Sequence, residues 1–208
     1  PYIFIAFGFI GCMYPAIDLF TGEKERGTIE TLLTTPVSRW QILVGKMLVI
    51  VTSGMLAASC ALLGLFVSIE FLDIVHNKEI LDIVHGILTP MFILSMFSLL
   101  LPLVVFFAGV MIPIAVYAKS FKEAQSIITP LNFVMVLPAM IGFFPGIELN
   151  ALTAAIPVVN IVLSTKELIS GTLSVGYYAI SLGVMLVLAT IAVIVSYKQF
   201  GKESRILN

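Results

Sequence analysis

Charge is the property that this sequence has least of. Charged residues make up 11% of its 208 positions and hydrophobic residues 60%, and no soluble domain of this length can bury so much apolar surface. The formal net charge of −1 excludes a nucleic-acid-binding protein that relies on attraction to phosphates. We therefore expect an all-α polytopic membrane protein, with the lipid bilayer as its surroundings.

Reactive side chains are also missing from the places where membrane enzymes and carriers need them. The two cysteines, Cys12 and Cys60, lie in apolar runs and offer neither a disulfide framework nor a metal-ligand spacing. No ionisable residue lies deep in an apolar run, since Asp18 and Lys46 are both near run ends. Ion-coupled carriers and intramembrane hydrolases generally need such residues at depth. The P-loop pattern G-x-x-x-x-G-K-[ST] is absent too, so we expect any ATP hydrolysis to occur in another molecule.

Five hydrophobic runs are long enough to cross about 30 Å of hydrocarbon. They cover residues 2–20, 41–69, 87–117, 126–144 and 173–197. Pro90, Pro102 and Pro113 lie along the third run and predict a kinked or broken helix. Lys46, one turn into the second run, is placed to extend back to the headgroups. Small residues in the same run predict close packing against another helix, namely Ser53, Gly54, Ala57, Ala58 and Ala61.

Lysine and arginine are distributed unequally between the polar breaks. When the breaks are numbered alternately, nine basic residues fall on one side and two on the other. The nine are Lys24, Arg26, Arg39, Lys46, Lys119, Lys122, Lys198, Lys202 and Arg205, and the two are Lys78 and Lys166. Basic residues favour the cytoplasmic side. We therefore expect a multi-pass protein of the plasma membrane with segment 21–40 and the C-terminus in the cytoplasm and the first residue outside.

Residues 147–171 are apolar enough to contact lipid but are interrupted by Pro157, Asn160, Lys166 and Glu167. A full crossing would place Pro157 and Asn160 near the middle of the bilayer, with freed backbone groups to satisfy. It would also move the C-terminal basic residues to the other side. We therefore expect a re-entrant or interfacial pair of short external helices.

The one strongly charged stretch is residues 21–40, TGEKERGTIETLLTTPVSRW. It predicts a short amphipathic helix over 22–34, capped by Thr21 and ended by Pro36. The apolar stripe of this helix comprises Ile29, Leu32 and Leu33, and the residues spaced to pair on another face are Glu23, Arg26 and Glu30.

A second helix should begin at once, because Ser38 to Gln41 has the form of a capping box. An amphipathic helix between two spans has two common uses. It can lie passively on the membrane surface, or it can bind a soluble partner. Spacing alone leaves both open.

A repeated sequence, LDIVH, occupies residues 72–76 and 81–85. Nine residues separate the copies, which is half a turn out of phase on one α-helix. Only if the chain folds back at Asn77 and Lys78 could the two Asp-x-x-His pairs meet at a cation. A plain external loop is the alternative that we favour.

Several motifs together resemble a known family. Residues 22–33 (GEKERGTIETLL), 35–38 (TPVS) and 45–46 (GK) resemble the cytoplasmic signature of ABC-2 type transporter permeases. The second half resembles the sodium-efflux, NatB-type branch of that family. Its matching motifs are KSFKEAQS at 119–126, TPL at 129–131, PAM at 138–140, PGIELN at 145–150 and IPVVN at 156–160.

The resemblance implies that the 22–34 helix is a coupling helix, which docks on an ATP-binding cassette subunit. The docking residues would be Glu23, Glu25, Arg26, Gly27, Thr28, Ile29, Glu30, Leu32 and Leu33. A pathway or its exit would involve Asn132, Pro138, Pro157 and Asn160. Cofactors are expected only in the partner, which would bind ATP and magnesium, and no metal site is expected in this chain.

On this resemblance, residues 1–208 form a single ABC-2 type transmembrane domain of a permease homodimer or heterodimer. The family's first span and external domain are absent, so we expect a fragment. The implied function is ATP-driven sodium efflux. The alternatives are another cargo, such as a peptide antibiotic, a drug or a lipid, and a membrane anchor or structural subunit without transport.

Overall fold

The structure, a computed structural model, describes residues 2–28, 31, 35–71 and 90–203. Within these ranges every regular element is a helix, which confirms the predicted all-α class. Five helices are long and apolar enough to cross a membrane, as predicted. They are Tyr2–Glu25, Arg39–Leu65, Met91–Tyr117, Phe121–Phe143 and Val175–Phe200. The LDIVH repeat lies outside the described residues.

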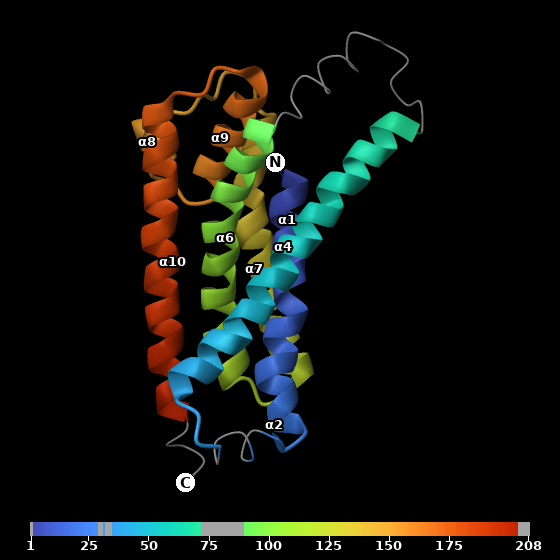
Figure 1. The fold of residues 1–208 in the computed structure, drawn as a ribbon, viewed down its shortest axis with the longest axis vertical. Coiled ribbons are helices and arrows are strands. Elements are labelled where there is room, and N and C mark those ends of the chain that lie inside the picture. The colour runs from blue at the N-terminus through green and yellow to red at the C-terminus, as the bar shows by residue number, and fades with distance from the viewer. Residues whose placement is uncertain (1, 29–30, 32–34, 72–89, 204–208) are drawn as a thin grey trace.

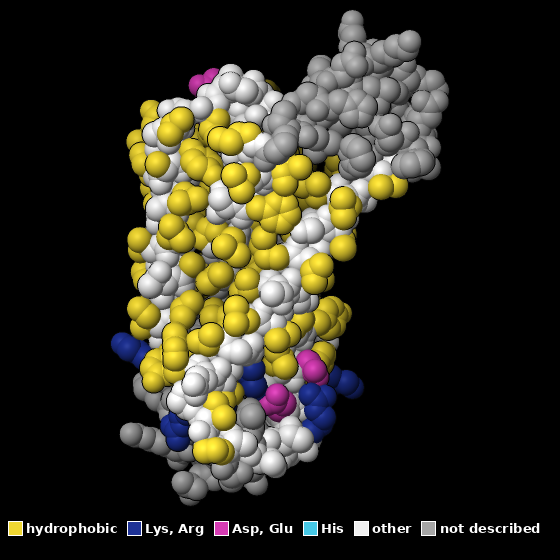
Figure 2. Space-filling view, viewed as in Figure 1, with side chains coloured by type: hydrophobic (Ala, Val, Ile, Leu, Met, Phe, Trp, Pro, Cys, Tyr) yellow, Lys and Arg dark blue, Asp and Glu magenta, His cyan; other side chains and the backbone are white. Residues whose placement is uncertain are grey.

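The long helices form one bundle and run alternately in opposite directions (Figure 1). They are α1 (Tyr2–Ile17), α4 (Arg39–Phe71), α6 (Pro90–Tyr117), α7 (Phe121–Val136) and α10 (Val175–Glu203). Figure 2 shows charged side chains gathered at the lower end, beneath a broad hydrophobic band. We name this lower end, with residues 18–28, 35–46 and 117–123, the charged end. The other end, with Tyr2 and residues 143–177, is the opposite end.

Helices α1 and α4 pack closely because small residues face each other. A methyl group added to Gly11 would lie 2.5 Å from Ala57 Cβ and 3.0 Å from the backbone oxygen of Ser53. Gly8 faces Gly54 in the same seam. These contacts confirm the close packing predicted from the small residues of the second run. The last turns of α4 then diverge from the bundle (Figure 1).

Helices α6 and α10 form a second close pair. A methyl group on Gly109 would lie 2.6 Å from Ala192 Cβ. Ser196 Oγ donates to the backbone oxygen of Gly109 at 2.6 Å, and towards the opposite end Tyr178 Oη donates to the backbone oxygen of Ser95 at 3.3 Å. Contacts of this kind along the helices hold α6 and α10 together over most of their length.

Helix α6 is continuous, so of the two predicted outcomes, a kinked or a broken helix, the break does not occur. Pro102 and Pro113 both lie inside one α-helix, so the expectation of a break is wrong. The physical reason is the surroundings of α6, which contacts α1, α4 and α10. Leu103, Phe107 and Met111 are fully buried against these neighbours. Membrane helices tolerate proline where neighbouring helices support the interrupted backbone.

The opposite end is closed by short helices rather than by a sixth long one. Helix α7 continues as a 3-10 helix, η2 (Leu137–Phe143), and the chain then forms α8 (Ala151–Ala154) and α9 (Val159–Ser170). Neither α8 nor α9 is long enough to be a candidate span. The prediction of two short helices within 147–171 is therefore confirmed.

Candidate docking site and pathway

The charged motif continues the first span instead of starting a new helix. Helix α1 passes through a π-helical turn, Asp18–Gly22, into α2 (Glu23–Glu25). Thr21 is buried within this continuous helix, and its Oγ1 donates to the backbone oxygen of Ala115 at 2.6 Å. The prediction that Thr21 caps a new helix is therefore wrong, because an uninterrupted helix has no free N–H groups there to cap.

Lys46 does not extend to the headgroups as predicted, because it is buried in an ion pair. Its Nζ donates to Glu23 Oε2 and to the backbone oxygen of Leu19, and it lies 4.8 Å from the centre of the Phe20 ring. The side chain of Lys46 is 8% exposed and that of Glu23 22%. Glu23 therefore pairs with α4, not with Arg26 along its own helix, and the expected pairing is corrected on this point.

Lys24 and Glu25 connect the motif to the turn between α6 and α7. Lys24 Nζ donates to the backbone oxygen of Val116, the penultimate residue of α6. Glu25 Oε1 accepts from the backbone N–H of Phe121 at 3.0 Å, at the first residue of α7. The first span is thereby tied to both helices that follow α4. Sequence reasoning missed these partners, which lie more than 90 positions away.

The start of α7 is also earlier than predicted. Ser120 caps it, since Ser120 Oγ accepts from the backbone N–H of Glu123 at 3.2 Å. Glu123 Oε2 in turn accepts from the backbone N–H of Lys119 at 2.8 Å. The helix consequently begins at Phe121, five residues before the predicted run of 126–144. This cap fixes the loop that Glu25 contacts.

Residues 25–28 of the motif, which we name its tip, are exposed. Arg26 Nη1 forms an exposed ion pair with Asp18 Oδ1 at 3.1 Å. Gly27 has φ of 67°, a left-handed conformation that favours glycine, and it follows the last turn of α2. Thr28 Oγ1 donates back to the backbone oxygen of Glu23 at 3.2 Å. Of the other predicted docking residues, those outside the described ranges are Ile29, Glu30, Leu32 and Leu33.

The next helix begins as the sequence predicted. Ser38 N–H donates to Gln41 Oε1 at 3.0 Å, and Gln41 N–H donates to Ser38 Oγ at 3.3 Å. This reciprocal pair is a capping box, and α4 starts at Arg39.

The predicted pathway residues lie on two different parts of the bundle. Asn132 is on α7, inside a candidate span, and its side-chain Nδ2 is buried without a hydrogen-bond partner among the described residues. Pro138 opens η2. Pro157 precedes a tight turn in which Val158 has φ of 69° and Val159 N–H donates to the oxygen of Pro157 at 2.8 Å. The structure thus places Asn132 in the span and Pro157 at the opposite end.

Asn160 is fully buried and fully hydrogen-bonded. Its Nδ2 donates to the backbone oxygens of Ala154 at 3.2 Å and Ser181 at 3.3 Å, and its Oδ1 accepts from Ile161 N–H at 2.8 Å. One side chain therefore joins α8, α9 and α10. Ser164 Oγ adds a second link, since it donates to Ser181 Oγ at 3.2 Å.

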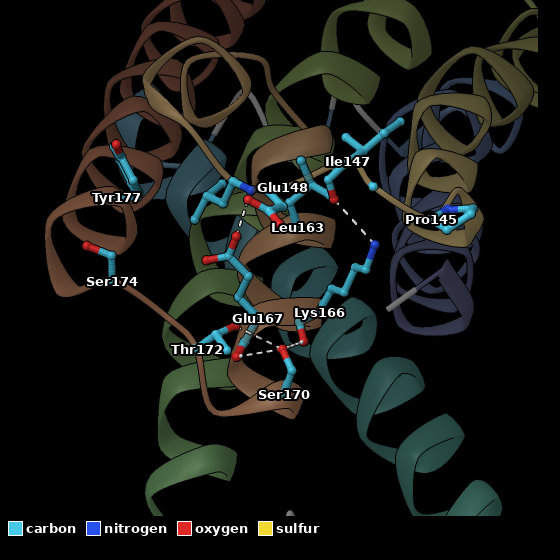
Figure 3. Close-up of a pocket in the computed structure, with 12 residues that line it drawn as sticks. Pro145, Ile147, Glu148, Leu163, Lys166, Glu167, Ser170, Thr172, Ser174 and Tyr177 are labelled. Carbon is cyan, nitrogen blue, oxygen red and sulfur yellow. Dashed lines mark hydrogen bonds between the residues drawn. The ribbon is translucent and has the colours of Figure 1, made fainter.

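An open pocket of about 580 Å³ lies at the opposite end, between the 145–149 loop, α9 and the start of α10 (Figure 3). Glu167 Oε1 accepts from Leu149 N–H at 2.6 Å. Lys166 Nζ donates to the backbone oxygens of Phe144 at 3.2 Å and Ile147 at 3.3 Å. Both charges therefore hold the loop instead of pairing with each other. The sequence marked Lys166 and Glu167 only as polar interruptions, because no pattern signals a backbone partner 18 to 22 positions away.

Five long apolar helices in one bundle, with charged groups gathered at one end, define a multi-pass membrane protein. The family of ABC-2 transporter proteins matches residues 2–205, and this chain belongs to that family. The ABC transporter permease protein NatB of Bacillus subtilis (strain 168) is 29% identical over 200 residues, which are 95% of this chain and 50% of the relative. The chain thus spans about half the length of that relative. A comparison with solved structures gave no significant match.

Proposed function

We propose that this chain is the membrane-spanning permease part of an ATP-driven exporter. A separate ATP-binding cassette subunit would bind ATP and magnesium and hydrolyse the ATP, since this sequence contains no P-loop. The observation that carries the proposal is the family match over residues 2–205 together with the exposed tip of the charged motif. We further propose that the charged end faces the cytoplasm, because basic residues gather there (Figure 2).

The docking surface in this proposal is the motif from Glu23 to Leu33. Its tip, residues 25–28, is exposed and offers Arg26 and the left-handed turn at Gly27. Ile29, Leu32 and Leu33 would supply the apolar contacts, each worth about 1.5–3 kcal/mol when buried. Glu23 would support this surface from beneath and not contact the partner, because its carboxylate is paired with Lys46.

The contacts beneath the tip support a mechanical role. Glu23 is paired with α4, Thr21 donates to α6, and Glu25 accepts from the first residue of α7. A displacement of the tip is therefore passed to four long helices at once. This arrangement fits a machine in which the partner's ATP binding drives the movement of the spans.

For the cargo, we propose sodium ions, on the resemblance to the sodium-efflux branch. Asn132 is the candidate for contact with the ion through its side-chain oxygen, because its amide lies within a span. The backbone oxygens near Pro138 and Pro157 are candidates for further contacts, since sodium prefers oxygen ligands. Asn160 would maintain the exit, because its hydrogen bonds hold α8 and α9 against α10. A second permease copy, identical or related, would complete the pathway.

Docking is tested by co-purification of the full-length protein with an ATP-binding cassette subunit. Leu32→Asp should abolish the complex while the permease stays in the membrane, because a carboxylate cannot be buried in an apolar cleft. Leu152→Asp is the matched control, since Leu152 is 80% exposed at the opposite end. Normal co-purification of the Leu32→Asp protein, or equal loss in both variants, would contradict the docking site.

The cargo is tested in inside-out vesicles that contain both subunits. ATP should drive uptake of radioactive sodium, and Asn132→Leu should reduce that uptake without reducing complex formation. ATP-driven transport of a peptide, drug or lipid without sodium uptake would replace the sodium assignment and leave the permease assignment standing. If transport by the intact complex did not depend on ATP, the assignment as an ATP-driven exporter would be wrong.

A further inference from the structure

We propose that the opposite end of the bundle binds one anionic phospholipid of the surrounding leaflet. The headgroup phosphate would contact Lys166, and part of one acyl chain would occupy an apolar slot next to it. This proposal does not depend on the cargo proposed above.

The slot is a small apolar cavity of about 110 Å³ between the start of α1, η2 and α9. Two of its lining residues pack tightly against each other, since a methyl group on Gly142 would lie 2.6 Å from Val162 Cγ1. Its wall includes the rings of Tyr2 and Phe143, whose centroids lie 6.1 Å apart. The lining is therefore apolar or aromatic except for Lys166, and it suits a hydrocarbon chain.

Lys166 supplies a positive charge at this slot. Its side chain lines both the slot and the larger pocket of Figure 3. The ammonium donates to the oxygens of Phe144 and Ile147, which leaves one of its three N–H groups for another acceptor. In the described parts of the chain the carboxylates are not within ion-pair distance of Lys166. A phosphate would balance this charge and accept a charge-assisted hydrogen bond.

The level of the slot matches the lipid headgroups. Tyr2 begins the first candidate span and Phe143 ends the fourth, so the slot opens where the spans leave the hydrocarbon. Aromatic side chains are typical of this boundary, and a lysine ammonium forms charge-assisted hydrogen bonds with a phosphate. A soluble anion would have no use for the apolar slot, and a neutral lipid would offer no net anionic headgroup to the third N–H of Lys166. The combination therefore fits an anionic phospholipid.

The test is native mass spectrometry of the full chain in detergent, titrated with phosphatidylglycerol or with phosphatidylcholine of the same acyl chains. The unmodified protein should retain one phosphatidylglycerol about fivefold better than phosphatidylcholine, as expected for one basic contact near the surface. Lys166→Gln should lose this preference, and Lys166→Arg should keep it. Lys198→Gln, at an exposed lysine near the other end of α10, should bind like the unmodified protein.

Lys166 also holds the 144–147 loop, so Lys166→Gln could change lipid binding by disturbing that loop. A second variant separates this effect from loss of the lipid contact. Ile169→Trp fills the slot but leaves the hydrogen bonds of Lys166 intact, so it should lower retention of phosphatidylglycerol. Equal retention of the two lipids by the unmodified protein would overturn the proposal, as would unchanged binding in both Lys166→Gln and Ile169→Trp. Equal retention of dodecanoate, which has a charge and a chain but no phosphate, would overturn the assignment to a phospholipid.

Discussion

The two ends of the bundle are held together by different kinds of polar contact. At the charged end, the contacts of Thr21, Lys24 and Glu25 join residues more than 90 positions apart. At the opposite end, Lys166, Glu167 and Asn160 bond to groups at most 22 positions away. The contacts at the charged end connect separate spans. Those at the opposite end hold α8, α9 and the loop before them together and fasten them to α10.

This difference determines where movement can be transmitted from one helix to another. A local cap keeps its shape when the helices beneath it shift, because few of its polar bonds cross from one long helix to another. At the charged end one helix cannot shift without affecting its neighbours, because bonds join α1 to α4, α6 and α7. Three experiments test this difference between the two ends of the bundle.

The largest expected effect concerns which end faces the cell interior. In a Cys60→Ser background, a cysteine introduced at Glu148 should react completely with an impermeant thiol reagent added outside intact cells. A cysteine at Lys122 should react only after the membrane is opened, because the basic charged end favours the cytoplasm. External labelling at Lys122 would reverse the proposed orientation.

A smaller effect is expected when the ion pair at the charged end is broken. Lys46→Met should lower the free energy of unfolding by about 2–3 kcal/mol, because it leaves the Glu23 carboxylate without its partner. The expected loss of free energy is smaller than for a fully buried pair because Glu23 is 22% exposed. Adding Glu23→Gln should restore part of the loss. Thermal or detergent-induced unfolding measures the free energy of unfolding of each variant, with Lys198→Met as the control. Equal losses in the single and double variants would show that the broken ion pair is not the cause of the loss.

The smallest effect compares two asparagines. Asn160→Leu should cost about 1–3 kcal/mol, since it leaves the buried oxygens of Ala154 and Ser181 without that donor. Asn132→Leu should be neutral or slightly stabilising, because its amide nitrogen has no described partner to lose. Unfolding of both variants in the same detergent checks the order. A larger loss for Asn132→Leu would mean that Asn132 has a structural role instead.

The sequence predicted those features that depend on local pattern. Long apolar runs located the five spans, because a bilayer demands such runs whatever the tertiary packing. The small residues around Gly54 indicated a close helix contact, and Ser38 with Gln41 indicated where α4 begins. Two short helices within 147–171 followed from the cost of placing Pro157 in the hydrocarbon.

The features that the sequence did not predict depend on partners distant in the chain. Thr21 has the residue type of a cap, but the helix already arrives from α1, and its hydroxyl finds Ala115 instead. Lys46 has the position of a snorkelling lysine, but Glu23 lies within reach once α1 and α4 are packed. The cap on α7 at Ser120 was hidden because the charged residues around it have the composition of a turn.

The continuity of the first span has a consequence for leverage. From Tyr2 to Glu25 the chain forms one helical rod of 24 residues, roughly 36 Å long at about 1.5 Å per residue. A rod of that length that tilts by about 10° around one end moves its other end by roughly 6 Å. The helix is unbroken between the exposed tip and the rest of this rod, although it contains Pro15 and the π-helical turn at Asp18–Gly22. A small angular change at the level of Glu25 is thus converted into a displacement about as large as one helical turn near Tyr2.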